Sequence, residues 1–392
     1  MRDGPASAVV TVGIVAGEAS GDALGAALIE AVRARHPRVR FVGIAGPRMQ
    51  AAGCEAWVPQ EKLAVRGFAE VLGHLPELVR IRRAIGRRML REHVPLFIGV
   101  DAPDFNLGLA RRLKYWGVRT VHFVSPSVWA WRAERVRRIS RAVDRMLVLF
   151  PFEPPLYEKA GVAVTYVGHP LAAGAAVPAT RAAAREVLRL PRHAPVFALL
   201  PGSRVSEIEM HAKVVLEAAS RMAESRPDAH FLVPLVSRDT REVFEKALYA
   251  GRYADLPITL MYGHATRALQ AADVGLVASG TASLEAALAR CPHVLFYKVS
   301  PLTARMVARR LLLPYVGLPN VLAGRFVVPE LLQDEATAGN LAQAALNLYD
   351  DTLTRERLEA LFARFGATLA ADTGQLAAEA VVAELAQAGV RC

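Results

Sequence analysis

Short apolar segments rich in β-branched residues alternate along this chain with longer segments of helical period, and this alternation constrains the fold more than any other feature. Strands that are apolar on both faces are typical of parallel sheets covered by helices on each side. The pattern predicts an α/β fold with two Rossmann-like, doubly wound domains, in which ligands bind at the carboxyl ends of the strands. We expect strands at 8–15, 39–44, 96–100, 120–124, 145–150 and 164–167, and then at 196–200, 230–235, 258–261, 274–278 and 294–297.

A change of composition marks the boundary between the two domains. Residues 171–180 are rich in Ala, Gly and Pro, which is typical of a linker. We therefore predict a first domain over residues 1–170, a linker and helix over 171–194, and a second domain over 195–350. Residues 351–392 have the composition of a helical tail, and we expect helices that break near Gly366 and Gly374 and pack across both domains.

Cysteine content and hydropathy exclude several classes of protein. The 392 residues include three cysteines, far apart in sequence, so neither a disulfide framework nor a cysteine-rich zinc module is expected. No apolar run approaches the ~18 residues that a membrane span requires. The apolar start of the chain lacks a basic flank and a cleavage site, so we interpret it as a strand rather than a signal peptide. These features predict a cytoplasmic protein.

The basic charge is concentrated in the first half of the chain. Of 48 Lys and Arg residues and 37 Asp and Glu residues, residues 1–171 hold 25 and 15, a net charge of +10 out of a total of +11. Such asymmetry indicates an anionic partner for this half: nucleic acid, a phosphorylated ligand or an acidic membrane surface. Residues 63–91 join an apolar stretch to a cluster of six arginines between positions 80 and 91, which suits a helix on a membrane surface, or an ordinary amphipathic helix on the sheet.

Two acidic motifs follow predicted strands of the first domain. Gly17 to Asp22 reads GEASGD, and its Glu18 and Ser20 favour a loop that faces a ligand. The alternative is a tight turn with Ser20 or Asp22 as the N-cap of the next helix. Asp101 and Asp104 follow what we count as the third strand, where an α/β enzyme positions a general base. Asp104 alone also suits an N-cap for a helix starting at Phe105.

Further loops of the first domain carry aromatic residues. Trp129 and Trp131 lie two apart in the segment SPSVWAWR, where they either stack on a ring or cover the core. The arginines that follow are expected to form a solvated basic helix.

The second domain contains two segments suited to binding a nucleotide. Gly202, Ser203 and Arg204 close its first strand, and a serine, backbone amides and an arginine fork can bind phosphate. The second segment repeats this pattern at a helix start, with Glu285 one turn inside, where a carboxylate can accept both ribose hydroxyls. Its other residues are Ser279, Gly280 and Thr281. Later, Asn320 stands beside a proline in an expected loop, as either a ligand contact or an Asx-turn.

Taken together, these motifs resemble the lipid-A-disaccharide synthase family of inverting glycosyltransferases, which have the two-domain GT-B architecture. The resemblance extends from the first strand to about residue 332. The matching segments are GEASGD (17–22), GIAGPRM (43–49), GVDAPDFN (99–106), SPSVWAWR (125–132), PFE (151–153), GHP (168–170), LPGSR (200–204), SGTASLE (279–285) and LPNVLAGR (318–325). Ala45 departs from the pattern, where a second glycine is usual.

The resemblance implies a reaction between UDP-2,3-diacylglucosamine and 2,3-diacylglucosamine 1-phosphate. The products are the β-1,6-linked disaccharide 1-phosphate and UDP, with no cofactor and no metal. The candidate base for the acceptor 6-hydroxyl is Asp101, with Asp104 and Glu18 as substitutes. Arg204 and Ser203 are expected to stabilise the leaving UDP, Glu285 to bind the ribose, and Asn320 to bind the diphosphate or the donor sugar.

The resemblance also implies where the enzyme works. The first domain takes the acylated acceptor at the anionic cytoplasmic face of the inner membrane, so we expect a peripheral protein and no nucleic-acid partner. Alternatives are another UDP-sugar enzyme of the same fold (a 2-epimerase or a hexosaminyltransferase), a nucleic-acid-binding protein, or a two-domain solute-binding protein. The sequence leaves open whether the chain forms a homodimer.

Overall fold

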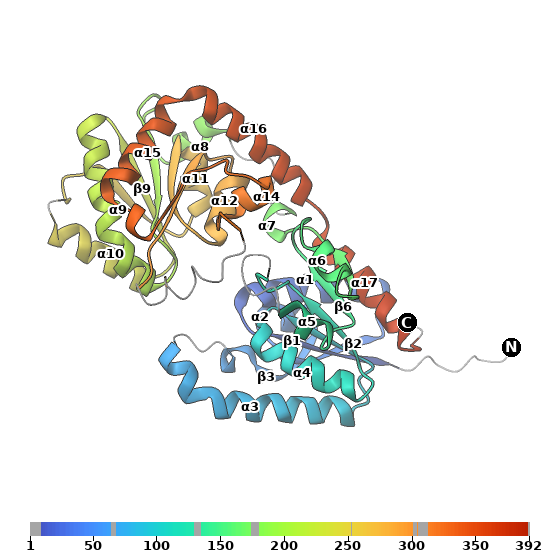
Figure 1. The fold of residues 1–392 in the computed structure, drawn as a ribbon. Coiled ribbons are helices and arrows are strands. Elements are labelled where there is room, and N and C mark those ends of the chain that lie inside the picture. The colour runs from blue at the N-terminus through green and yellow to red at the C-terminus, as the bar shows by residue number, and fades with distance from the viewer. Residues whose placement is uncertain are drawn as a thin grey trace, which may run out of the picture. The chain divides into compact units, whose positions relative to one another are not determined.

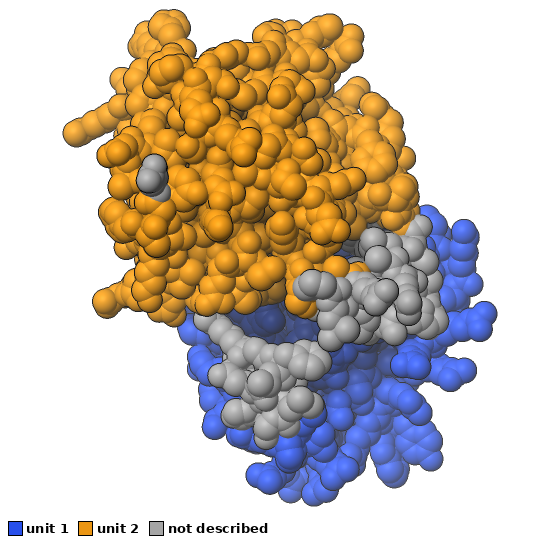
Figure 2. All heavy atoms as spheres, turned by 60° about the vertical axis from the view of Figure 1, so that its left-hand side comes forward, with its two compact units in different colours: residues 1–173, 369–392 blue, residues 174–368 orange. Residues whose placement is uncertain are grey.

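The chain divides into two compact units, described in turn below. The structure is a computed structural model that describes residues 9–63, 68–128, 135–173, 180–251, 253–300, 304 and 313–390, with backbone only for 68–74 and 173. Unit 1 comprises residues 1–173 and 369–392, and unit 2 comprises residues 174–368 (Figures 1 and 2).

Unit 1 contains a parallel sheet of seven strands in the order β3-β2-β1-β4-β5-β6-β7. All five residues of β4 are buried, as are the last five of β1, because helices cover both faces of the sheet. The direction in which strands are added reverses between β1 and β4, and ligands of such sheets bind at this reversal. The strands are β1 (Val10–Ala16), β2 (Val39–Ala45), β3 (Cys54–Pro59), β4 (Leu96–Val100), β5 (Arg119–Phe123), β6 (Arg145–Val148) and β7 (Ala163–Tyr166).

Two layers of helices cover this sheet (Figure 1). Apolar side chains of α1 and α17 pack in one buried cluster with one face of the sheet, and those of α3 and α4 pack in another cluster with the opposite face. The chain therefore returns to unit 1 to supply α17. The helices are α1 (Ala19–Arg35), α2 (Pro47–Ala51), α3 (Phe68–Arg91), α4 (Pro103–Tyr115), α5 (Arg135–Ser140), α6 (Pro154–Glu158), α7 (Pro170–Ala173) and α17 (Thr373–Gln387), with a 3-10 turn at Gln60–Lys62.

Unit 2 repeats the plan with a parallel sheet in the order β10-β9-β8-β11-β12-β13. Here the order reverses between β8 and β11. The strands are β8 (Val196–Leu200), β9 (His230–Leu235), β10 (Ile258–Tyr262), β11 (Val274–Ala278), β12 (His293–Tyr297) and β13 (Glu330–Leu332). The helices are α8 (Arg181–Val187), α9 (Val205–Ser225), α10 (Arg238–Ala250), α11 (Ala265–Ala271), α12 (Thr281–Leu288), α14 (Leu318–Ala323), α15 (Ala338–Asp350) and α16 (Thr352–Leu369), with a 3-10 turn at Gln333–Glu335.

The predicted fold class is confirmed, with four local corrections. The strand before Asp101 is the fourth of unit 1, because β3 precedes it, and β13 is a further strand that was not predicted. Gly366 and Gly374 lie inside α16 and α17 rather than at breaks, and the interruption falls between these helices at residues 370–372. Asn320 lies in helix α14 rather than in a loop. Residues 174–179 of the predicted linker lie outside the described residues.

Candidate active site

Asp101 lies at the carboxyl end of β4, at the point where the strand order of unit 1 reverses. Its backbone is left-handed, with φ of 51°, and the next residue, Ala102, has φ of 42°. The Asp101 amide donates to the Phe123 carbonyl of β5 at 2.8 Å. Two successive non-glycine residues in this sparsely populated region cost energy, and such strain gathers at functional sites.

Glu18 and Asp101 are brought together by the loops that follow β1 and β4. Gly17 lies so close to Ala102 that a Cβ on Gly17 would come within 2.6 Å of the Ala102 Cβ, so a glycine is required here. Burial raises the pKa of Asp101, an effect opposed by a hydrogen bond from the Ala102 amide and reinforced by the negative charge of Glu18. Two of the three candidate bases, Asp101 and Glu18, therefore lie close to each other.

Asn106 of α4 holds this loop in place, and the sequence interpretation assigned it no role. Its fully buried side-chain amide donates to the Asp101 carbonyl at 2.8 Å, and to the Val15 and Val100 carbonyls at 3.3 Å each. It thus joins the ends of β1 and β4 and orients the strained residue between them. Asn106 ends the segment GVDAPDFN, which the sequence analysis singled out. Its bridging role could not be predicted, because an amide that bonds two strand ends leaves no characteristic spacing in the sequence.

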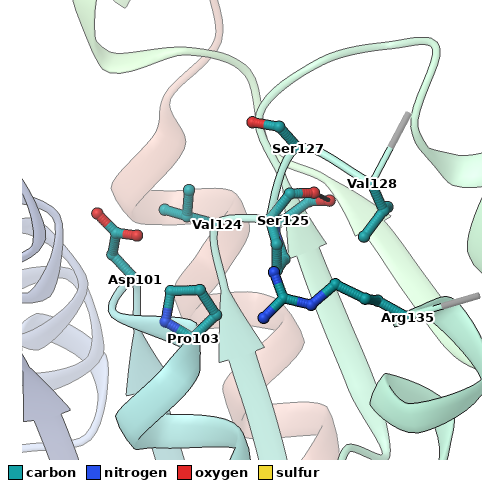
Figure 3. Close-up of a pocket in the computed structure, with 8 residues that line it drawn as sticks. Asp101, Pro103, Val124, Ser125, Ser127, Val128 and Arg135 are labelled. Atoms are coloured by element: carbon teal, nitrogen blue, oxygen red, sulfur yellow. Dashed lines mark hydrogen bonds between the residues drawn. The ribbon is translucent and has the colours of Figure 1, made fainter. Parts of the chain in front are cut away.

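A pocket of about 320 Å³ opens beside Asp101. Figure 3 shows Asp101 and the Arg135 guanidinium on opposite sides of Val124, with the guanidinium below Ser125. Val124 has φ of 80°, a third strained residue at this edge. The Ser125 hydroxyl lies 2.6 Å from the Tyr157 hydroxyl, which fixes the loop that lines the pocket. The remaining lining residues are Pro103, Pro126, Ser127 and Val128.

The buried carboxyl group of Glu153 contacts the loop that contains Ser125. Burial raises the pKa of Glu153 to about 7, against hydrogen bonds from the Phe150 amide and the Ser125 hydroxyl. Glu153 belongs to the segment PFE that the sequence analysis noted.

Asp104 is placed differently from Asp101. Its side chain is 89% exposed and pairs with Arg135 at 2.7 Å. The N-cap interpretation of Asp104 is wrong, because α4 begins at Pro103 with Ala102 as its N-cap.

The segment GEASGD also differs in part from expectation. Helix α1 begins at Ala19 with Glu18 as N-cap, so neither Ser20 nor Asp22 caps it. Ser20 is exposed in its first turn. The buried Asp22 carboxylate instead accepts the amides of Gly46 at 2.9 Å, Arg48 at 2.9 Å and Met49 at 3.1 Å, and so caps the separate helix α2. Asp22 therefore joins two of the motifs noted above.

In unit 2, the segment Gly202 to Arg204 lies between β8 and α9, at the reversal of strand order. The Arg204 side chain is 76% exposed, and Ser203 is exposed beside it. Their backbone amides, however, donate to the Glu207 carboxylate at 3.2 Å and 2.8 Å respectively. These two amides are therefore already bonded within the protein, contrary to the expectation that they bind phosphate, and the Ser203 and Arg204 side chains are the groups that remain exposed.

Glu207 organises this segment, and its role was missed. The Tyr297 hydroxyl donates to it at 2.9 Å. Burial tends to raise the pKa of Glu207, but hydrogen bonds from Ser203, Tyr297 and Arg204 outweigh burial and lower it. A Cβ on Gly202, which has φ of 133°, would come within 2.6 Å of the Glu207 Cβ.

The second nucleotide segment lies on the neighbouring strand at the same edge. Ser279 follows β11, Gly280 is the N-cap of α12, and Thr281 is exposed at the first helical position. Glu285 is half-buried one turn along, and accepts a hydrogen bond from the Thr266 hydroxyl at 2.6 Å. The edge between β8 and β11 therefore gathers every predicted nucleotide contact except Asn320.

Asn320 is fully buried in α14 and bonded to the protein through both ends of its amide. Its oxygen accepts the Val327 and Val328 amides at 2.7 Å and 2.9 Å, and its nitrogen donates to the Val328 carbonyl at 3.0 Å and to Glu330 at 2.7 Å. Contact with a ligand would require some of these bonds to break.

Other predicted features lie outside what can be placed. Trp129, Trp131 and Arg132 are not among the described residues. The described residues contain no cluster of three or more His, Cys, Asp or Glu side chains suited to hold a metal ion. Within the same part of the chain, every helix is too short or too polar to cross a lipid bilayer.

Known proteins resemble this chain in sequence and in fold. The sequence model of the family described as lipid-A-disaccharide synthetase matches residues 12–381. A lipid-A-disaccharide synthase of Chromobacterium violaceum is 54% identical over 371 residues, which cover 95% of this chain and 96% of that protein.

The solved structures confirm the GT-B architecture. The glycosyltransferase of kitacinnamycin aligns with a TM-score of 0.60 at 17% identity, covering 96% of this chain and 99% of its own. MurG of Acinetobacter baumannii aligns with a TM-score of 0.55 at 14% identity, covering 95% and 99%. At such identities the structures show the fold alone, whereas the sequence similarity extends over nearly the whole chain. The chain belongs to the lipid-A-disaccharide synthase family and is a glycosyltransferase.

Proposed function

We propose that Asp101 is the general base in an inverting transfer of 2,3-diacylglucosamine from UDP to the 6-hydroxyl of 2,3-diacylglucosamine 1-phosphate. Asp101 takes the hydroxyl proton, the oxygen bonds to the anomeric carbon of the donor, and the bond from that carbon to UDP breaks. The observation that carries this assignment is the position of Asp101, a strained and partly buried carboxyl beside a pocket at the reversal of strand order. A raised pKa suits a base, because it strengthens the proton affinity of the carboxylate.

The donor nucleotide is assigned to the β8–β11 edge of unit 2. Arg204 and Ser203 offer a guanidinium and a hydroxyl to the diphosphate, and the start of α12 at Gly280 and Thr281 adds the positive end of a helix. Glu285 accepts the ribose hydroxyls. Charge on the departing UDP is stabilised by these groups.

The anionic cytoplasmic face of the inner membrane is the proposed place of work, because both substrates carry acyl chains. Helix α3 supports this proposal through Arg80, Arg83, Arg87 and Arg91, which are all exposed and recur every three or four residues along one face. No carboxylate in the described parts of the chain forms an ion pair with any of the four. The opposite face buries Ile85 and Met89 in unit 1.

Turnover of the Asp101→Asn variant tests the base assignment. The wild-type protein should release UDP from UDP-2,3-diacylglucosamine when 2,3-diacylglucosamine 1-phosphate is supplied, with metal chelated. Asp101→Asn should lower kcat by about 10²–10⁴-fold, the usual contribution of a general base, and leave UDP binding intact. Asp104→Asn is the matched variant and should retain turnover, since its carboxylate faces solvent.

Two results would redirect the proposal. Turnover at the wild-type rate in Asp101→Asn would remove Asp101 from the role, and loss of turnover in Asp104→Asn would transfer it. An enzyme that accepts unacylated acceptors as readily as diacylated ones would instead favour a different UDP-sugar transferase.

A further inference from the structure

Arg135 lines the same pocket as Asp101 and forms an ion pair with Asp104. Arg135, the first residue of α5, is only 26% exposed at its side chain, whereas Asp104 of α4 is 89% exposed. The Arg135 nitrogen Nη2 donates to the Asp104 carboxylate at 2.7 Å. Among the described residues, Asp104 is the one acidic residue that forms an ion pair with Arg135.

The two partners differ in how firmly they are held. A carboxylate almost surrounded by water is a weak counter-ion, because solvent screens its attraction and its side chain keeps its freedom. The guanidinium has five N–H donors, and Asp104 engages one nitrogen. Asp104 can therefore turn into solvent at little cost, which leaves a planar donor fork facing the pocket.

The pocket sets this cation opposite the proposed base. Asp101 and the Arg135 guanidinium lie on opposite sides of Val124, and the guanidinium lies below Ser125 in this view (Figure 3). The Ser125 hydroxyl already contacts Tyr157, so it shapes the loop, while the exposed Ser127 adds a second hydroxyl to the lining. A ligand with a reactive hydroxyl at one end and an anion at the other suits such a pocket. Arginine forks bind phosphate through two parallel hydrogen bonds.

We propose that Arg135 binds the 1-phosphate of the acceptor sugar, and that Asp104 is an exchangeable counter-ion which this phosphate displaces. The inference rests on the proposed function for the identity of the acceptor. It assigns Arg135 to substrate selection, so that the acceptor hydroxyl is presented to Asp101 only when the phosphate is in place.

The test compares 2,3-diacylglucosamine 1-phosphate with 2,3-diacylglucosamine that lacks the phosphate. The wild-type protein should prefer the phosphorylated acceptor, and Arg135→Gln should reduce the ratio of the two kcat/KM values by about 10- to 100-fold, as expected for lost charge-assisted hydrogen bonds. KM for the UDP-sugar should not change. Arg138→Gln, an exposed arginine on the same helix, is the matched control and should keep the preference.

Asp104→Asn supplies a test of opposite sign. Because it removes the competing carboxylate, it should lower KM for the phosphorylated acceptor, whereas a purely structural ion pair would make both variants worse. A thermal unfolding midpoint near the wild-type value in Arg135→Gln would show that the protein remains folded. Equal losses on both acceptors, or a wild-type enzyme indifferent to the phosphate, would overturn the assignment.

Direct binding separates this assignment from the reaction itself. Calorimetric titration with 2,3-diacylglucosamine 1-phosphate should show weaker binding to Arg135→Gln than to the wild type and to Arg138→Gln. If this difference appears while no acceptor supports UDP release, the phosphate site stands and the proposed function fails. If turnover proceeds and binding is indifferent to Arg135, the phosphate site fails alone.

Discussion

The carboxyl of Glu18 lies close enough to Asp101 to influence its ionisation, although burial has the larger effect on the Asp101 pKa. A general base acts in its ionised form, so kcat/KM should fall as the pH drops through the raised pKa of Asp101. Glu18→Gln removes a negative charge that favours the protonated form. The acid limb of the pH profile should therefore move to lower pH, while burial keeps it above the ordinary aspartate value.

A pH profile of kcat/KM between about pH 4 and 9 would measure this shift. Glu18→Asp keeps the charge and serves as the control, with a limb near the wild-type position. A limb that stays in place or moves to higher pH in Glu18→Gln would contradict the electrostatic coupling of the two carboxyl groups.

Asn106 gives a second prediction at this scale. Asn106→Asp replaces the donor amide with a carboxylate that faces three carbonyl oxygens, so the loop carrying Asp101 should lose its left-handed conformation. We expect kcat to fall about 10- to 100-fold with little change in KM for the UDP-sugar, because unit 2 is untouched. Steady-state kinetics in both substrates would measure the split.

The exposed Asn340, which donates to the Glu335 carbonyl at 2.9 Å, allows a matched substitution. Asn340→Asp should leave kcat unchanged. If Asn106→Asp raises KM for the donor as strongly as it lowers kcat, then Asn106 supports the fold in general rather than the orientation of Asp101.

These residues also show how far sequence patterns reach into the site. Asp101 could be predicted because it directly follows a buried strand, and because parallel strands bring their carboxyl ends to one edge. Asn106 could not, since it bonds carbonyl groups of two strands that come together only on folding. Glu207 bonds the nearby Ser203 and Arg204 amides, but the sequence does not distinguish it from any other carboxylate in a first helical turn. Whether Asp104 faces the site or the solvent also depended on the first turn of α4, which no spacing specified.

Individual elements show the same division between what periodicity encodes and what it does not. Strands β4, β8, β9 and β11 have the predicted bounds, because each is a continuous apolar run between helices. Strand β3 lies at the sheet edge and is largely half-exposed or exposed, so it lacks that signal, and β13 has only three residues. The helix at Asn320 has six residues, and Asn320 bonds it to Glu330 of β13.

Helix α17 is attached to the sheet of unit 1 by a buried charge. Glu384 is fully buried and forms ion pairs with Arg119 of β5 and with Arg145 of β6, the latter at 2.8 Å. Glu384→Gln leaves Arg145 without its counter-charge and leaves Arg119 with the more distant Asp144 carboxylate, at 3.8 Å. Because both arginines are partly exposed, we expect a loss of about 2–4 kcal/mol rather than the full cost of a dry ion pair.

Native-state hydrogen exchange of the α17 amides would measure this loss. Glu379 lies on the same helix and pairs with Arg35 at 3.3 Å, but both side chains are more than half exposed. Glu379→Gln should therefore change the protection of α17 by less than about 1 kcal/mol. Equal effects of the two substitutions would show that burial of Glu384 adds nothing to the attachment of α17.

At the scale of the whole molecule, part of the excess basic charge of the first half of the chain lies on the exposed face of α3. Like charges three and four residues apart on a helix repel one another, so the stripe Arg80, Arg83, Arg87 and Arg91 tends to destabilise α3 unless an anion offsets it. Replacing all four with Gln should greatly weaken binding to vesicles that contain acidic phospholipid, since each basic residue near such a surface contributes about 1 kcal/mol. Co-sedimentation at several salt concentrations would measure this binding.

A control of equal charge distinguishes the stripe from net charge. Arg192, Arg221, Arg357 and Arg364 are exposed residues of unit 2, and their replacement by Gln changes the total charge by the same amount. This second variant should bind acidic vesicles as the wild type does, and neither should bind neutral vesicles more weakly than the wild type. If both quadruple variants lose binding equally, attraction follows total charge and α3 is not the membrane-facing element. The α3 variant can retain turnover on detergent-dispersed substrates while it no longer binds vesicles. That result would show that membrane binding and catalysis are separate properties of unit 1.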